Sequence, residues 1–133
     1  FNVYGRGQTG SYAGVITKFI NHLKEKKPPM IFGNGTQVRD FIFVEDVARA
    51  NISAMRSNVK GGFFNIGTGV TTSIRQLAEQ IVILSGLELK PQYEKPLEGD
   101  VSASQADTTS AKKFLGWEYT VQLNDGLKKF FPL

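Results

Sequence analysis

The 133-residue sequence contains no cysteine, so it carries neither a disulfide framework nor a thiolate metal site. It has no apolar run that approaches the ~20 residues needed to span a membrane. Its first residues do not show the charged segment and apolar segment of a signal peptide. These absences predict a cytoplasmic protein with no membrane partner.

Motifs of several common chemistries are also missing. There is no P-loop, and no grouping of serine, histidine and aspartate suggests nucleophilic catalysis. The single histidine, His22, has no second histidine or carboxylate cluster near it, so we predict no metal site and expect His22 to face solvent. The net charge of +4 comes largely from lysines typical of solvated helix ends. No arginine stripe alternates with aromatics, and we expect no nucleic-acid partner.

The composition that remains is that of an ordinary folded domain. Hydrophobic residues make up 41% and charged residues 21% of the chain, which argues against disorder. Strands and helices alternate, so the sequence predicts a single α/β unit over residues 1–133 with few, short strands. Because the first residues already have a strand pattern and the predicted sheet is small, we expect a fragment of a longer protein.

Residues 28–47 contain the strongest local signal. They predict a strand over 30–32, a glycine turn over 33–35 and a second strand over 40–44, with Arg39 just before that strand. A glycine turn lets the backbone approach a flat ligand, and a guanidinium binds anions, so the stretch favours nucleotide binding. A surface ion pair between Arg39 and Asp40 explains the same residues equally well.

Hydrophobic periodicity and turn residues predict the other elements. A helix opens at Glu45, and we interpret Asp46 in its first turn as an acid suited to a helix N-terminus and not as a catalytic group. Its buried side is expected to include Ile52 and Met55. Ser73 and Gln76 predict a capping box. The further elements expected are a strand over 1–4, helices over 13–26 and 73–86, a buried strand over 63–66, an edge strand over 91–94, a helix over 108–115 and an amphipathic segment over 123–131.

Residues 5–10 match G-x-G-x-x-G between a predicted strand and a predicted helix. Two further residues separate Gly10 from the helical pattern, and no acid follows about 20 residues later at the end of a second strand. We therefore interpret this loop as a chance match and not as a dinucleotide site. The helix start near Gly14 and Val15 offers backbone N–H groups that suit a diphosphate.

The chain as a whole carries, in order, FNVYG, IFGNGTQVRDFIFVEDVARA, FNIGTG with TSI, and GD followed by QAD, AKKFLGW and NDGL. This pattern resembles the carboxy-terminal part of the extended short-chain dehydrogenase/reductases that modify nucleotide sugars, and it is most similar to UDP-glucose 4-epimerases. The resemblance covers essentially all residues. It implies a Rossmann-type enzyme whose N-terminal Rossmann core is absent from this chain, so that NAD is bound mainly by the missing upstream domain. It also implies a homodimer for the full-length protein.

The resemblance implies a substrate site for a UDP-sugar and no catalytic residue here, because none of the four tyrosines begins a Tyr-x-x-x-Lys motif. Three departures from the family pattern matter, and one of them is the loop that reads YGRGQ where YGPRQ is common. Leu97 stands where an arginine is frequent, with Lys95 as a possible substitute, and Ser104 stands where a tyrosine can lie near the sugar. The implied contacts are Asn2, Gly14, Val15 and Arg39 with the diphosphate, Met30 and Phe32 with uracil, and Asp100 near the ribose.

These expectations predict the nucleotide-sugar-binding part of an NAD-dependent UDP-glucose/UDP-galactose 4-epimerase. In the mechanism that the resemblance implies, C4 is oxidised, the 4-keto sugar rotates, and hydride returns to the other face. The fragment alone is expected to be inactive. A nucleotide-sugar 4,6-dehydratase or a UDP-glucuronate decarboxylase is the alternative within the family, and a non-catalytic nucleotide-binding module is the alternative of another class.

Overall fold

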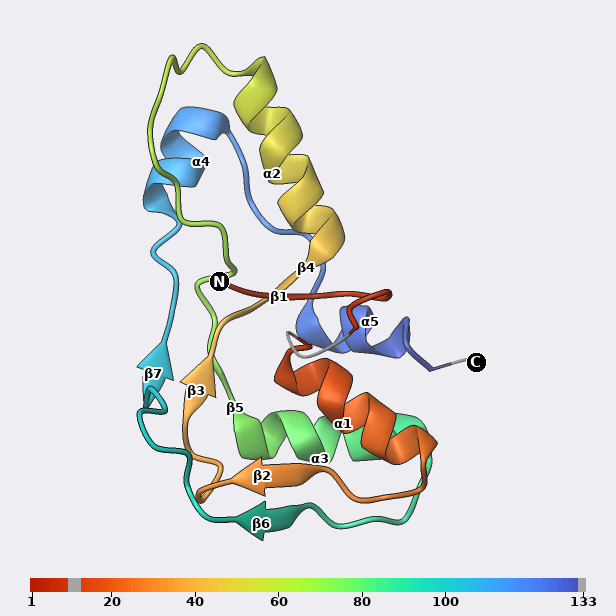
Figure 1. Cartoon of the computed structure of the whole chain (residues 1–133). Coiled ribbons are helices and arrows are strands. Elements are labelled where there is room, and N and C mark those ends of the chain that lie inside the picture. The colour runs from red at the N-terminus through yellow and green to blue at the C-terminus, as the bar shows by residue number, and fades with distance from the viewer. Residues whose placement is uncertain (10–12, 132–133) are drawn as a thin grey trace.

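The computed structural model describes residues 1–9 and 13–131, so Gly10 of the glycine loop lies outside the described residues. The described chain has the α/β class that the sequence predicts, and its outline is elongated (Figure 1). No helix within the described ranges combines the length and hydropathy needed to cross a bilayer. The helices are α1 (Val15–Lys24), α2 (Val44–Arg56), α3 (Ile74–Ser85), α4 (Thr109–Leu115) and α5 (Leu123–Lys128). The strands are β1 (Asn2–Tyr4), β2 (Met30–Phe32), β3 (Val38–Arg39), β4 (Phe41–Phe43), β5 (Thr72–Ser73), β6 (Gln92–Glu94) and β7 (Ala103–Ser104).

The strands form three small sheets. Strand β1 runs parallel to β4, and β2 runs parallel to β6, with Met30 opposite Gln92. Strand β3 lies between β5, which is antiparallel, and β7, which is parallel and places Ser104 opposite Arg39. Because β6 and β7 flank β2 and β3, the segment that joins β6 to β7 runs past the ends of both strands (Figure 1).

The main core lies between α1, α3, α5 and strand β4. The amphipathic pattern predicted for α1 is confirmed, since its apolar stripe is buried against α3. The capping box of α3 is also confirmed: Ser73 Oγ accepts from Gln76 N at 3.1 Å, and Gln76 Oε1 accepts from Ser73 N at 3.1 Å. The stripe of α1 and its partners on α3 are Ile16, Phe19, Ile20, Leu23, Leu77, Ala78 and Ile81.

A smaller core lies at the opposite end of the molecule, under α2 and α4 (Figure 1). Trp117 is buried there, and its indole N–H donates to the Asp46 carbonyl at 3.0 Å. The Asp46 carboxylate is buried in the first turn of α2 and accepts from the backbone N–H groups of Thr120 and Val121 at 3.1 and 3.0 Å. These bonds join α2 to the segment before α5, which supports a structural role for Asp46.

Two predictions about buried segments are wrong. The side of α2 expected in the core is exposed, since Ile52 is 46% and Met55 is 85% exposed. The buried residues of this helix are Asp46 and Ala50 instead, because the smaller core packs on that side. Residues 63–66 form no strand within the described chain, and Phe63 is fully exposed, although Phe64 and Ile66 pack partly against the smaller core.

Candidate functional site

The glycine turn between β2 and β3 is present as predicted. Gly33 and Gly35 adopt positive φ values of 80° and 75°, which side chains disfavour, so both positions suit glycine. Between them, Asn34 Oδ1 accepts from the N–H and hydroxyl of Thr36 at 3.0 and 2.6 Å. The turn brings the end of β2 close to the start of β3.

Strand β2 presents one backbone edge away from β6. Pro29 O accepts from Gln92 N at 2.9 Å, and Gly33 N donates to Glu94 O at 3.0 Å, so the odd-numbered residues of this strand face β6. Because backbone groups alternate in direction along a strand, those of Met30 and Phe32 point to the opposite edge. Met30 and Phe32, the two residues expected to contact uracil, therefore direct their backbone N–H and C=O groups away from β6.

Arg39 and Asp100 form an ion pair across 61 positions of sequence. Arg39 Nη2 lies 2.5 Å from Asp100 Oδ1, and the two side chains are 14% and 32% exposed. The alternative prediction of a surface ion pair between Arg39 and Asp40 is wrong. Asp40 is fully buried, and its carboxylate accepts from Thr68, Gly69 and Ala106. Two candidate residues from distant segments therefore meet at one place.

A cavity of about 440 Å³ gathers most of the candidate residues. Of the seven, Asn2, Val15, Met30, Phe32, Arg39 and Asp100 line it. The seventh, Gly14, is the N-cap of α1 directly before Val15, and it is not among the lining residues. The cavity is thus bounded by β1, α1, the edge of β2 that faces away from β6, the end of β3 and the segment that carries Asp100.

The residues that depart from the family pattern differ in whether they line the cavity. Leu97 lines the cavity, so an apolar group lies on the wall where an arginine was expected. Lys95 and Ser104 are not among the lining residues, although Ser104 pairs in register with Arg39 on β7. The proposed substitution by Lys95 therefore gains no support from the cavity.

Sequence reasoning missed three polar residues that line the cavity: Lys18, His22 and Gln37. Lys18 and His22 follow Val15 at helical spacing on α1, so the stripe from Val15 to His22 was the available signal. His22 was expected to face solvent, which is wrong: it is half-buried, and its Nδ1 lies 3.0 Å from the Pro28 carbonyl. That carbonyl can only accept, so Nδ1 carries the proton in this contact.

The described part of the glycine loop, residues 5–9, has a packing role. A Cβ on Gly5 would lie 2.4 Å from Val44 Cγ1, so this glycine is needed for packing against α2. Helix α1 begins at Val15, and Gly10, the third glycine of the match, lies outside the described residues. Tyr4 is also unsuited to proton transfer, because burial, with Asp46 and Asp125, raises the pKa of its hydroxyl well above the ordinary range. The described part of the loop, residues 5–9, therefore gives no support for a dinucleotide site.

Comparison with known proteins identifies the family. A model of the NAD dependent epimerase/dehydratase family matches residues 1–67, which is half of the chain. The chain belongs to this family. Its relatives include a putative UDP-glucose 4-epimerase of Methanocaldococcus jannaschii, 41% identical over 96% of this chain, and a UDP-glucose 4-epimerase of Mycolicibacterium smegmatis, 39% identical over 96% of it.

Solved structures give the same family relationship. The UDP-glucose 4-epimerase of Thermotoga maritima, solved with UDP-glucose, superimposes with a TM-score of 0.90 at 41% identity over 98% of this chain. The Rossmann-type α/β class is therefore confirmed. The chain spans 43% of that structure and 41% of each of the two curated relatives.

Proposed function

We propose that this chain is the nucleotide-sugar-binding part of an NAD-dependent UDP-glucose/UDP-galactose 4-epimerase. The single observation that carries the proposal is the 440 Å³ cavity, which brings six of the seven candidate residues together from five segments of the chain. Membership of an epimerase/dehydratase family and similarity to UDP-glucose 4-epimerases support the reaction class.

The cavity offers chemistry for each part of a nucleoside diphosphate. On the edge of β2 that faces away from β6, the Phe32 N–H and the Met30 carbonyl match an acceptor and the donor of a uracil imide, while the Phe32 carbonyl accepts from Gln37. The ring of Phe32, a residue that is 39% exposed, can stack on a base. Arg39 and Lys18 place two cations on the cavity wall, which favours a diphosphate. Asp100 supplies a carboxylate that can accept from ribose hydroxyl groups.

In this proposal the chain binds and the chemistry is completed elsewhere. NAD supplies hydride transfer at C4 when it is bound, and its site lies mainly in an upstream Rossmann domain of the complete protein. The residues of this chain hold the uridine and diphosphate, so binding energy remote from the reacting carbon retains the sugar while it rotates. The chain by itself is expected to turn over no substrate, and the complete protein is expected to be a homodimer.

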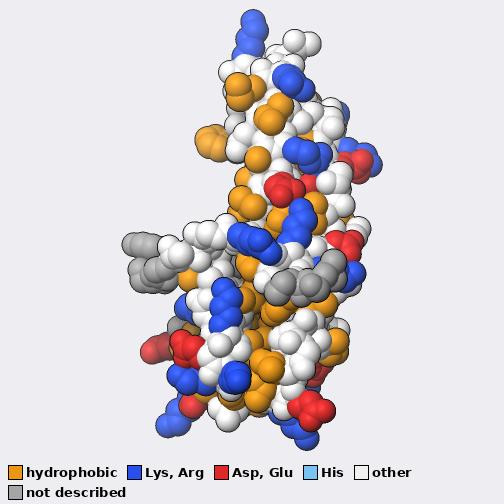
Figure 2. Space-filling model, turned by 90° about the vertical axis from the view of Figure 1, so that its right-hand side faces the viewer, with side chains coloured by type: hydrophobic (Ala, Val, Ile, Leu, Met, Phe, Trp, Pro, Cys, Tyr) orange, Lys and Arg blue, Asp and Glu red, His pale blue; other side chains and the backbone are white. Residues whose placement is uncertain are grey.

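An exposed apolar surface supports the proposed contact with an upstream domain. Val44, Ile52 and Met55 of α2 are 43%, 46% and 85% exposed, and Phe1 and Val3 are 43% and 40% exposed. Figure 2 shows hydrophobic side chains along the length of one face of the molecule. Exposed apolar groups of this kind are typical of a surface that another part of a protein covers.

Calorimetry on the complete protein tests the binding function. We expect UDP, UDP-glucose and UDP-galactose to bind with similar affinity, because the proposed contacts are to the shared nucleotide. CDP is the control. Its cytosine lacks the imide N–H of uracil, so CDP should bind more weakly than UDP. Equal binding of UDP and CDP, or no binding of either, would contradict the assignment.

Product analysis then separates the related reactions. Incubation with UDP-glucose should yield UDP-galactose with no loss of water or carbon dioxide. A 4-keto-6-deoxy product would identify a dehydratase, and release of carbon dioxide from UDP-glucuronate would identify a decarboxylase. Nucleotide binding without any turnover by the complete protein would favour the non-catalytic binding module.

A further inference from the structure

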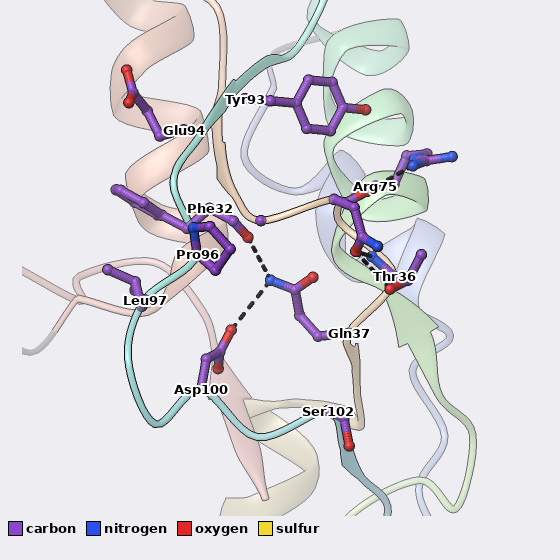
Figure 3. Close-up of a pocket in the computed structure, with 12 residues that line it drawn as sticks. Phe32, Thr36, Gln37, Arg75, Tyr93, Glu94, Pro96, Leu97, Asp100 and Ser102 are labelled. Carbon is purple, nitrogen blue, oxygen red and sulfur yellow. Dashed lines mark hydrogen bonds between the residues drawn. The ribbon is translucent and has the colours of Figure 1, made fainter.

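We propose that Gln37 is a positioning residue. Its side chain holds strand β2, which is proposed to contact the base, and the Asp100 carboxylate, which is proposed to bind the ribose, in a fixed relative position. The inference rests on the proposed function and concerns how the same site distinguishes a ribose from a deoxyribose. Gln37 lies between the glycine turn and β3, and it belongs to the lining of the 440 Å³ cavity and of an adjoining groove of about 670 Å³ (Figure 3).

The side chain of Gln37 makes two hydrogen bonds to candidate site residues. Its Nε2 donates to the Phe32 carbonyl at 2.8 Å and to Asp100 Oδ2 at 3.2 Å. Figure 3 shows the amide pointing between these two groups, which come from different segments. An amide nitrogen has two N–H donors, so one side chain can hold both acceptors at once.

The backbone of Gln37 is itself held in place. Its carbonyl accepts from Ile74 N at 3.0 Å, at the start of α3, and the following residue, Val38, donates its N–H to Ser102 O at 2.9 Å. Helix α3 is fixed by its capping box and by the main core. The amide of Gln37 is therefore a fixed point to which the segment carrying Asp100 is attached.

Asp100 then has a defined orientation. Arg39 donates to its Oδ1 and Gln37 to its Oδ2, so each oxygen is held by one donor. A carboxylate has about four acceptor positions, so both oxygens keep capacity for hydroxyl donors. With Gln37 removed, Arg39 would be the one described side chain that still donates to the carboxylate, and Asp100 could rotate about that contact.

The experiment compares two ligands and two variants in the complete protein. Calorimetry measures the affinities of UDP and of 2′,3′-dideoxy-UDP, which lacks both ribose hydroxyls. We expect the parent protein to prefer UDP by on the order of 10-fold or more, the scale of a hydrogen bond to a charged acceptor. Gln37→Met keeps the length of the side chain and removes both hydrogen bonds.

In Gln37→Met we expect the preference to fall to about 2-fold, with the affinity for the dideoxy ligand nearly unchanged. Gln92→Met is the matched control, because Gln92 is exposed on the neighbouring strand β6 and lines neither cavity. An undiminished preference in Gln37→Met, or an equal loss for both ligands, would overturn the positioning role while leaving the proposed function intact. Failure of the parent to bind UDP would overturn both.

Gln37→Glu gives a second, independent readout. At neutral pH the introduced carboxylate would repel Asp100, so UDP should bind more weakly than to the parent. As the pH falls, protonation restores a donor and the deficit relative to the parent should shrink. A deficit that does not change between pH 8 and pH 5 would overturn the inference even if Gln37→Met failed to fold.

Discussion

Arg39 and Asp40 are neighbours in sequence but belong to opposite kinds of environment. Asp40 is fully buried, and its carboxylate accepts from the N–H and hydroxyl of Thr68 at 2.9 and 2.7 Å, from Gly69 N at 2.8 Å and from Ala106 N at 3.1 Å. Arg39 points to the other side, into the wall of the cavity, where it meets Asp100.

The difference between the two residues is one of remaining hydrogen-bonding capacity. The four donors to Asp40 come from two separate loops, so its charge is satisfied by the fold itself. Arg39 has five N–H donors, of which the described contacts use one to the Val38 carbonyl and one to Asp100. A charge at a cavity wall with donors to spare suits a ligand, whereas a satisfied buried charge suits the fold.

The sharpest test of the comparison is Asp40→Ala. It would leave several buried donors without an acceptor, and we expect the free energy of unfolding to fall by about 4 kcal/mol. Urea denaturation measures this loss. Asp40→Asn, which keeps one acceptor oxygen, should lose less, and Arg39→Ala should lose about 1 kcal/mol or less. Equal losses for Asp40→Ala and Arg39→Ala would remove the distinction.

The converse test measures ligand affinity. Arg39→Ala is expected to weaken UDP-sugar binding to the complete protein by about 1.5–3 kcal/mol, the scale of a charge-assisted hydrogen bond. Calorimetry with UDP-glucose gives the value. Arg56→Ala, at the exposed end of α2, is the control and should bind as the parent does. Unchanged affinity in Arg39→Ala would count against the diphosphate assignment.

Asp46 is a second buried carboxylate that serves the fold, and its contribution to stability depends on pH. Burial raises the pKa of its carboxyl, but hydrogen bonds from Arg49, Val121 and Thr120 outweigh burial and hold the pKa below the ordinary value of 3.8. The stability it contributes is therefore fully present above that value and is lost as the pH falls through the lower, folded-state pKa.

Asp46→Asn tests this assignment. It should cost about 1.5 kcal/mol at pH 7, because charge-assisted hydrogen bonds are lost. It should also lose less stability than the parent between pH 5 and pH 2, and urea midpoints across this range measure both effects. Parallel pH profiles for parent and variant would show that another group controls acid unfolding.

The smallest expected effect concerns the second cation of the cavity. Lys18 is exposed on α1, so Lys18→Met should weaken UDP binding by only about 0.5–1 kcal/mol. The loss should shrink at high salt, because the contact is screened. Lys60→Met, an exposed lysine outside the cavity, is the control. A loss in Lys18→Met equal to that in Arg39→Ala would place the main diphosphate contact on α1.

Local features of the fold follow from the sequence for local reasons. The capping box at Ser73, the stripe of α1 and the turn at Gly33 and Gly35 depend on residues within one or two helical turns of one another. The predictions for residues 63–66 and for the apolar side of α2 are wrong because they too rest on local sequence alone. Their apolar content predicts burial, but it does not specify which side another element covers.

The candidate site depends both on local sequence and on contacts between distant segments. The sequence determined the α/β class, the glycine turn and the family resemblance that singled out seven residues, six of which line one cavity. Only the tertiary structure decided that Arg39 pairs with Asp100 and not with Asp40, and that Gln37 joins Asp100 to the end of β2. These contacts join residues up to 63 positions apart, and such distances are set by how the strands pair and the core packs.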